Sequence, residues 1–175
     1  MLAGPANVSL GTFRGTDDTL RYMREFALGP EGERHYLVRQ FAEDIVRDIA
    51  PKDYLSEILA LRYWATSPRI RYTNDARHVE QVKTPVRTLT EIQKQGFALL
   101  DCDDIATVIA ALGMAFGREA SFVVVGFGAP GAYTHVFARL KEPKSGAWIV
   151  CDPVAGPNEA DMLRRVKTYK IVSVD

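Results

Sequence analysis

The spacing of apolar residues switches once along this chain, and the order of the two patterns restricts the fold. Ahead of Gly117, five apolar side chains recur at helical spacing: Ile105, Val108, Ile109, Leu112 and Phe116. They predict a helix over 102–116 with one buried face. After Gly117, "SFVVVGF" is apolar throughout, whereas "THVFARL" and "AWIVCDP" alternate. Buried and half-buried strands have these patterns, so we predict an α+β fold with helices first and an antiparallel sheet last.

The N-terminal part of the chain also has the helical pattern. One helix is predicted in "DDTLRYMREFAL", capped by Asp17 or Asp18 and ended by a Gly-Pro pair. A second is predicted over 31–50, where apolar residues recur at steps of three and four. A third is predicted in "DYLSEILALRYWATSP", which closes at a proline.

Between the third helix and the helix at 102–116 the pattern is weaker. We expect an extended linker in "PRIRYTND" and then a loop as far as Pro85. A short helix is predicted over 88–94, starting at Thr88 or Thr90. Near the end of the chain, "KTYKIVSV" is a candidate fourth strand.

Length and composition favour a single domain. The chain has 175 residues, 47% of them hydrophobic, which is enough for a core that needs neither a disulfide nor a structural metal. It contains no internal repeat and no long Gly/Ser-rich linker. We therefore expect one domain over 1–175, with a helical part at 17–67 and a core of helix plus antiparallel sheet at 86–175.

Charge and cysteine content narrow the choice of partners and compartment. Lys plus Arg and Asp plus Glu both number 22, so no net field attracts nucleic acid or an anionic membrane. No apolar run reaches about 18 residues, and "MLAGPANVSL" lacks a charged leader. Cys102 and Cys151 are too few for a disulfide framework and lack the spacing of a zinc site. We expect a cytoplasmic protein with free thiols that binds neither nucleic acid nor membrane.

Cys102 follows Asp101, a good N-cap residue, at the start of the helix predicted over 102–116. The free N–H groups and the dipole at a helix N-terminus favour a thiolate. The carboxylates of Asp101, Asp103 and Asp104 disfavour it, because like charges raise the pKa of a thiol. A cationic partner is therefore needed if Cys102 is to act as a nucleophile.

His135 is the histidine best placed to be that partner. His35 and His78 lie in charged or polar stretches, and we interpret both as surface residues. His135 begins "HVFARL", where alternation turns it away from the apolar face. A hairpin through "EPKSG" would bring Asp152 close to the start of this strand. Cys151 must then face the opposite way, so we interpret it as a small buried apolar residue.

Three stretches, "DCDDIATVIAALGMAFGREASFVVVGF", "YTHVFARL" and "AWIVCDP", resemble the transglutaminase-like superfamily of papain-like thiol enzymes. The resemblance covers about residues 70–153 and is closest to the small stand-alone members from bacteria and phages. It implies a papain-like core in which the cysteine heads a long helix packed on an antiparallel sheet. The motif positions fall on Cys102, His135 and Asp152. The family usually has glycine before its Asp-Cys pair, whereas this chain has Leu100.

The resemblance implies a cysteine peptidase or another amide hydrolase with a Cys-His-Asp catalytic triad and a peptide or protein substrate. Cys102 would attack an amide carbonyl, His135 would carry the proton to the leaving amine, and Asp152 would fix the imidazole tautomer. The backbone N–H of Cys102 would stabilise the oxyanion, and Gln95, seven residues upstream, is the candidate side-chain donor. No cofactor or metal is implied. The protein would work in a bacterial host cell or a phage particle.

Three alternatives stay open. A lysine amine as acceptor would make the protein a crosslinking transglutaminase, that is, a protein-glutamine amine transferase. The small size favours hydrolysis, because little chain is left to build a water-excluding amine site. The fold could also serve as a non-catalytic structural domain of a phage or bacterium. A magnesium or calcium site in "DCDD" is disfavoured, since Asp103 and Asp104 should point about 100° apart on a helix.

Overall fold

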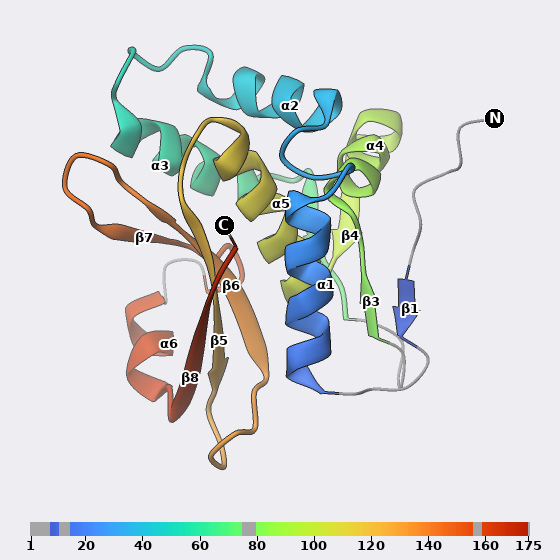
Figure 1. Cartoon of the computed structure of the whole chain (residues 1–175), viewed down its shortest axis with the longest axis vertical. Coiled ribbons are helices and arrows are strands. Elements are labelled where there is room, and N and C mark those ends of the chain that lie inside the picture. The colour runs from blue at the N-terminus through green and yellow to red at the C-terminus, as the bar shows by residue number, and fades with distance from the viewer. Residues whose placement is uncertain (1–7, 11–14, 75–79, 156–158, 175) are drawn as a thin grey trace.

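The computed structural model describes residues 8–10, 15–74, 80–155 and 159–174. Six helices form within these residues: α1 (Thr16–Leu28), α2 (Tyr36–Val46), α3 (Tyr54–Ala65), α4 (Pro85–Gln95), α5 (Cys102–Ala115) and α6 (Glu159–Arg165). The same residues form eight strands: β1 (Val8–Leu10), β2 (Ile70–Tyr72), β3 (Glu80–Val82), β4 (Ala98–Leu100), β5 (Ala120–Gly126), β6 (His135–Lys141), β7 (Trp148–Cys151) and β8 (Thr168–Ser173). Figure 1 shows helices and the sheet as separate layers, so the predicted α+β class is confirmed.

The main sheet has the strand order β7-β6-β5-β8, and every neighbouring pair is antiparallel. All seven residues of β5 are buried, which explains why its sequence is apolar throughout rather than alternating. One face of β5 and β6 packs into the main core with Val124, Val136 and Ala138. The other face, with Val123 and Phe137 among its residues, is covered by Met162 of α6.

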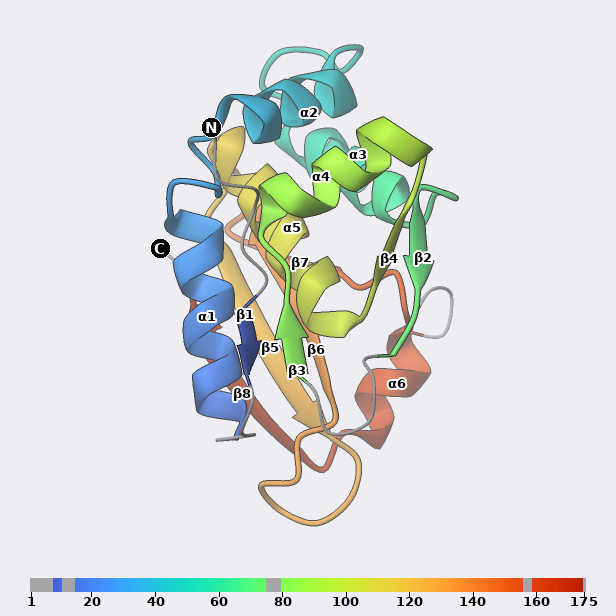
Figure 2. The ribbon, with the colours of Figure 1, turned by 90° about the vertical axis from the view of Figure 1, so that its right-hand side faces the viewer.

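Helix α5 is the central element of the fold. It contacts β5 and β6 on one side and α1, α2, α3 and α4 on the others, as Figure 2 shows for α1 and α4. Every residue from Asp103 to Met114 is buried. The sequence pattern predicts one buried face, but the helices of the N-terminal part enclose the second face as well. At Gly113 the approach of β6 is so close that a Cβ atom would lie 2.5 Å from a methyl carbon of Leu140.

Two short strand pairs lie outside the main sheet. β1 pairs with β3 in antiparallel orientation, and β2 pairs with β4 in parallel orientation. In the second pair Tyr72 lies opposite Leu100, and the N–H of Thr73 donates to the carbonyl of Leu100 over 2.9 Å. This pairing holds the segment after β2 beside the start of α5. The expected linker and loop before Pro85 therefore contain strands β2 and β3.

Three predicted helix starts are wrong. α1 begins at Thr16 after Gly15, and neither Asp17 nor Asp18 caps it. α2 begins at Tyr36 rather than at residue 31, since the Nδ1 atom of His35 accepts the N–H of Leu37 and caps the helix there. α4 begins at Pro85 rather than at Thr88 or Thr90, with Thr84 as its cap.

Helix α1 is attached to the last strand of the sheet. The Nε atom of Arg24 donates to the carbonyl of Val174 over 3.0 Å. The Nζ atom of Lys170 lies 2.6 Å from a carboxylate oxygen of Asp17. Elements 150 residues apart in sequence are thus joined along one side of the molecule.

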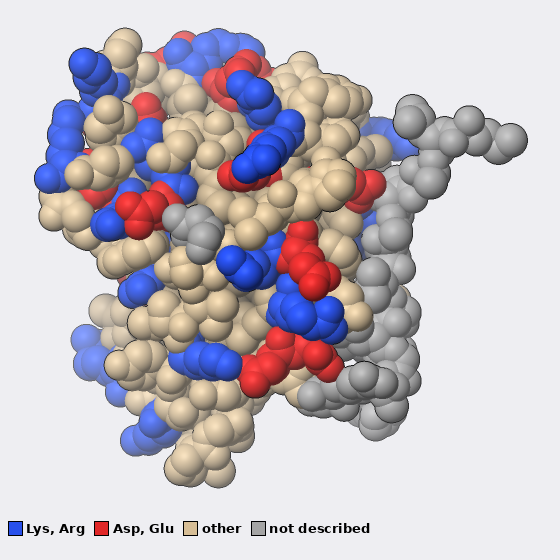
Figure 3. Space-filling view, in the orientation of Figure 1, with Lys and Arg blue, Asp and Glu red and all other residues tan. Residues whose placement is uncertain are grey.

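On the face seen in Figure 3, basic and acidic side chains are interspersed. This matches the equal totals of 22 basic and 22 acidic residues. In the part of the chain that the structure describes, no helix is long and apolar enough to cross a lipid bilayer.

Candidate active site

Cys102 is the first residue of α5, as the sequence predicts. The predicted cap is also confirmed: a carboxylate oxygen of Asp101 accepts the N–H of Asp104 over 3.3 Å. The thiol is therefore held at the N-terminus of a helix whose remaining length is fixed in the core. A side chain at such a position is held rigidly, which suits a nucleophile.

His135 and Asp152 form a close pair across two neighbouring strands. The Nε2 atom of His135, the first residue of β6, lies 2.7 Å from Oδ2 of Asp152, which follows directly after β7. The pairing of Ala138 with Cys151 in the β6–β7 register brings these two strand ends together. The Oδ1 atom of Asp152 accepts the N–H of Val154 over 3.0 Å, and the aspartate is 2% exposed. This buried carboxylate fixes the orientation of the imidazole and leaves its Nδ1 atom for another partner.

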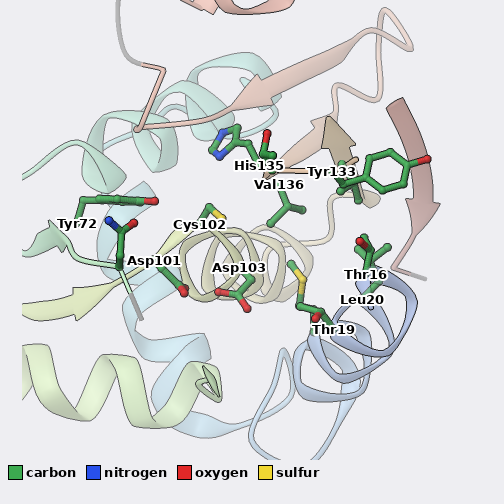
Figure 4. A pocket seen from close by; sticks show the side chains of 14 residues that line it. Thr16, Thr19, Leu20, Tyr72, Asp101, Cys102, Asp103, Tyr133, His135 and Val136 are labelled. Carbon is green, nitrogen blue, oxygen red and sulfur yellow. The ribbon is translucent and has the colours of Figure 1, made fainter. Parts of the chain in front are cut away.

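Cys102 and His135 line the same pocket, which has a volume of about 290 Å³. Figure 4 shows the imidazole above the end of α5 that carries Cys102. The structure thus brings together the three residues that the sequence singles out: Cys102, His135 and Asp152. A thiol beside an imidazole that a carboxylate orients is an arrangement for nucleophilic chemistry.

The surroundings of Cys102 oppose its ionisation. Burial, followed by the charges of Asp103 and Asp101, raises the pKa of the thiol to about 12. The backbone N–H groups of Val136 and of Cys102 itself act in the opposite direction. The helix N-terminus does not compensate for burial and the carboxylates, so the resting group at neutral pH is a thiol. A base must remove its proton before attack.

The carboxylates beside the thiol converge, contrary to expectation. One oxygen each of Asp101, Asp103 and Asp104 lies within 4.8 Å of the others, and Asp103 and Asp104 are both buried. Asp103 and Asp104 are neighbours on a helix and should point in different directions. Neither side chain is exposed, because the first turn of α5 is enclosed on several sides. One oxygen of Asp104 accepts the N–H of Lys83 over 2.5 Å. The cluster is therefore tied into the chain.

Gln95, the candidate oxyanion donor, is not brought to the pocket. It is the last residue of α4 and is exposed, and its side-chain amide donates to the carbonyl of Phe97 over 3.0 Å. Helix α4 ends one residue later at Gly96, in the left-handed conformation with φ of 86°. Only its sequence distance from Cys102 favours Gln95, and the chain between the two residues turns away at Gly96.

Tyr72, unlike Gln95, lies at the pocket. It lines the pocket from the end of β2, and Figure 4 shows its hydroxyl directed towards the end of α5 with Cys102. Burial raises the pKa of Tyr72, as do the nearby charges of Asp101 and Asp103. The phenol therefore keeps its proton and can donate a hydrogen bond. The sequence offers one indirect signal for Tyr72, namely that the resemblance begins at the stretch "IRYTND".

The other histidines and the second cysteine lie elsewhere. His35 caps α2, and His78 lies outside the described residues. Cys151 is 1% exposed and packs in the main core, as predicted for a small apolar residue. Helix α1 contributes several side chains to the pocket wall.

The chain matches no protein-family model and no curated protein. Its fold is similar to that of a solved structure from Cytophaga hutchinsonii, described as "a Putative Cysteine Protease". The TM-score is 0.55 and the sequence identity 16%, over 93% of this chain and 54% of the other. This chain therefore spans about half the length of that protein. At this identity the similarity shows a shared fold.

Proposed function

We propose that this chain is a thiol-dependent acyl-transfer enzyme that acts on peptide or protein amides, most simply as a cysteine peptidase or another amide hydrolase. The observation that carries the proposal is the 2.7 Å contact between His135 and Asp152 beside the pocket that Cys102 lines. The fold shared with a protein of the cysteine-protease type supports it. Membership of the transglutaminase-like superfamily, inferred from the motifs, belongs to the same proposal.

In the first half of the reaction, His135 acts as the general base. Its Nδ1 atom takes the proton of the Cys102 thiol while the sulfur bonds to the substrate carbonyl carbon. Asp152 stabilises the imidazolium that forms. The imidazolium then gives its proton to the leaving amine as the C–N bond breaks, which leaves a thioester on Cys102. This order suits a thiol whose pKa is raised to about 12, since no resting thiolate is required.

Two donors are available for the negative charge that develops on the carbonyl oxygen. The backbone N–H of Cys102 lies at the free N-terminus of α5. The Tyr72 hydroxyl, on the same side of the pocket as Asp101 in Figure 4, is the side-chain donor in place of Gln95. In the second half of the reaction, His135 activates water, which releases the acid and restores the thiol. An amine acceptor at this step would give a crosslinked product instead.

Variants of the site residues test this proposal with a peptide library, in the presence and absence of an amine donor. New peptide termini indicate hydrolysis, and isopeptide products indicate transfer. We expect Cys102→Ala and His135→Ala to abolish turnover, and Asp152→Ala to reduce it less completely. Tyr72→Phe should lower kcat by about 10²-fold, with a smaller effect on KM, if the phenol binds the oxyanion.

The matched control is Cys151→Ala, which removes the other thiol of the chain and should leave turnover in place. Thermal unfolding of each variant shows whether the fold is retained. A folded wild-type protein that yields neither product would favour the non-catalytic structural domain. Turnover that survives in a folded His135→Ala variant would remove the general base from the mechanism.

A further inference from the structure

The face of the main sheet that points away from α5 carries an arginine without an acidic partner in the described part of the chain. Arg139 of β6 follows Ala138, which packs in the main core, so its side chain lies on the other face. In the β6–β7 register, Arg139 lies opposite Val150, and Lys141 lies opposite Trp148. Opposite residues share a face, so these four side chains lie together. Figure 1 shows β7 and α6 as neighbours on this side of the molecule.

The guanidinium of Arg139 is stacked on an aromatic ring rather than paired with a charge. Its Cζ atom lies 4.3 Å from the centroid of the Trp148 ring, and both residues are half-buried. The Nε atom of Arg139 is buried and has no hydrogen-bond acceptor in the described part of the chain. Burial also lowers the pKa of this group from its ordinary value, because part of its hydration is lost. The ring offsets only part of this cost.

Two carboxylates on this side of the sheet are bound to other cations. Glu119, just before β5, holds Lys141, whose Nζ atom lies 3.0 Å from each of its carboxylate oxygens. Glu159 of α6 accepts a hydrogen bond from Arg62 of α3 over 2.7 Å. Arg139 is therefore a cation that no carboxylate of the described residues neutralises. A carboxylate from another molecule would supply the charge-assisted hydrogen bonds that it lacks.

An exposed isoleucine lies two strands away from this arginine. Ser121 of β5 lies opposite Arg139, and Ser173 of β8 lies opposite Ser121. Ile171 is two residues from Ser173, on the same face, and is 44% exposed. Neighbouring strands are about 4.8 Å apart, so β8 lies about 10 Å from Arg139. An extended peptide covers that distance in about three residues, at about 3.3 Å per residue.

We call Arg139, Trp148 and Ile171 the Arg139 surface. We propose that it binds an extended acidic segment of another protein, whose carboxylate pairs with the guanidinium and whose apolar side chains cover the tryptophan and the isoleucine. A planar carboxylate fits the fork of a guanidinium, and apolar groups around the pair shield it from water. Nucleic acid is disfavoured, because tight binding of its backbone needs several unpaired cations and the Arg139 surface offers one.

The Arg139 surface is separate from the Cys102 pocket. Val124 and Val136, which line that pocket, lie on the face of the sheet that packs in the main core. The inference therefore goes beyond the proposed function and does not rest on it. It holds equally for a hydrolase, a transferase or a non-catalytic structural domain.

Two capped heptapeptides test the need for a carboxylate: Ac-Phe-Ser-Ser-Glu-Ser-Ser-Phe-NH2 and the same peptide with Gln in place of Glu. Each carries an aromatic group three residues from the central position on both sides. Binding is followed by NMR through the indole N–H signals of Trp148 and of Trp64, which is packed in the main core and serves as the internal reference. We expect the Glu peptide to shift the Trp148 signal and to bind about tenfold more tightly than the Gln peptide.

Arg139→Gln should abolish this preference, so that both peptides bind equally weakly. The matched control is Arg39→Gln, which removes an exposed arginine of α2 and should keep the preference. Equal binding of the two peptides by the wild type, or no shift of the Trp148 signal by either, would overturn the proposal. A preference that survives in a folded Arg139→Gln variant would overturn it as well.

A ten-nucleotide oligothymidylate is the third probe, and it separates the two kinds of acidic partner. It should leave the Trp148 signal in place at the concentration at which the Glu peptide shifts it. Tighter binding of the oligonucleotide than of the Glu peptide would assign the surface to nucleic acid and overturn the proposal. Both peptides and the oligonucleotide are compared on the wild-type protein, so the test stands even if Arg139→Gln fails to fold.

Discussion

At the scale of single residues, the site combines a nucleophile with groups that restrain it. Burial and two carboxylates keep Cys102 protonated, while in the proposed mechanism His135 and its buried partner Asp152 supply a base. A protonated thiol is a weak nucleophile and reacts slowly with oxidants. Reactivity would therefore appear only when the proton passes to His135 as a substrate carbonyl is attacked.

Asp103→Asn tests the restraint on the thiol. The amide keeps the shape of the side chain and can still accept the N–H of Asp104, which the carboxylate now accepts over 2.9 Å. Removing the negative charge should lower the pKa of Cys102. For each unit by which this pKa falls, the fraction of thiolate rises tenfold, whereas the nucleophilicity of the thiolate drops about threefold. Alkylation at pH 7.5 should therefore speed up about threefold for each unit.

Asp48→Asn, an exposed carboxylate near the end of α2, is the control for Asp103→Asn and should leave the alkylation rate at the wild-type value. The rates are measured with iodoacetamide under pseudo-first-order conditions. A slower or unchanged rate in Asp103→Asn would contradict the assignment of the pKa shift to this charge.

The residues of the site differ in how far the sequence could predict them. Cys102 and His135 begin long elements and Asp152 follows directly after a strand, and helical or strand periodicity places such ends well. Tyr72 and Gln95 depend on how short segments turn, which periodicity does not record. A glycine in the left-handed conformation directs the chain after Gln95 away, and a parallel pairing brings Tyr72 in.

At the scale of elements, α4 shows how a cap sets a helix start. The Oγ1 atom of Thr84 accepts the N–H of Arg87 over 3.3 Å, and Pro85 takes the first helical position, where its missing N–H costs nothing. The apolar pattern alone predicts a start at Thr88 or Thr90. It misses the first turn because Thr84 and Pro85 precede the periodic residues.

Thr84→Ala should therefore destabilise the protein, whereas Thr90→Ala should not. Loss of the cap is expected to lower the free energy of unfolding by about 1 kcal/mol. In the interior of α4, alanine is a better helix former than threonine, so Thr90→Ala should change stability by a few tenths of a kcal/mol at most, in the favourable direction. Urea unfolding of both variants measures the difference. A larger loss in Thr90→Ala would place the helix start where the pattern predicts it.

Long elements were predictable and three-residue strands were not. α5 has four turns of consistent spacing, β5 is an unbroken apolar run, and β6 and β7 alternate, so their positions and the α+β order follow from the pattern. β2 and β4 are three residues each and pair across 28 positions of sequence. Three residues are too few to show a period, and a parallel pairing leaves no turn signal between its strands.

At the scale of the whole molecule, the buried thiols make stability depend on alkaline pH. Burial raises the pKa of Cys151 from its ordinary value of 9.0 to about 12. Between these values the unfolded chain releases a proton that the folded chain keeps. The folded state then binds more protons than the unfolded state, so the free energy of unfolding falls as the pH rises from 9 towards 12.

Cys151→Ala should reduce this alkaline loss of stability. The variant lacks the thiol whose proton the folded state retains. Its free energy of unfolding should therefore decline less steeply with rising pH than that of the wild type. Urea unfolding at pH 7, 9 and 10.5 gives both slopes, and the ionisation of tyrosines and lysines is common to the two proteins. Parallel pH dependences would contradict the burial of an un-ionised thiol at this position.

The contacts between α1 and the last strand join a segment that the ribosome makes early to one that it makes late. Arg24 emerges early, but the carbonyl that it binds belongs to Val174, which is added last among the described residues. This bond cannot fasten the α1 wall of the pocket before β8 has been synthesised. The nascent polypeptide therefore carries Cys102 in an unfinished enclosure until β8 leaves the exit tunnel.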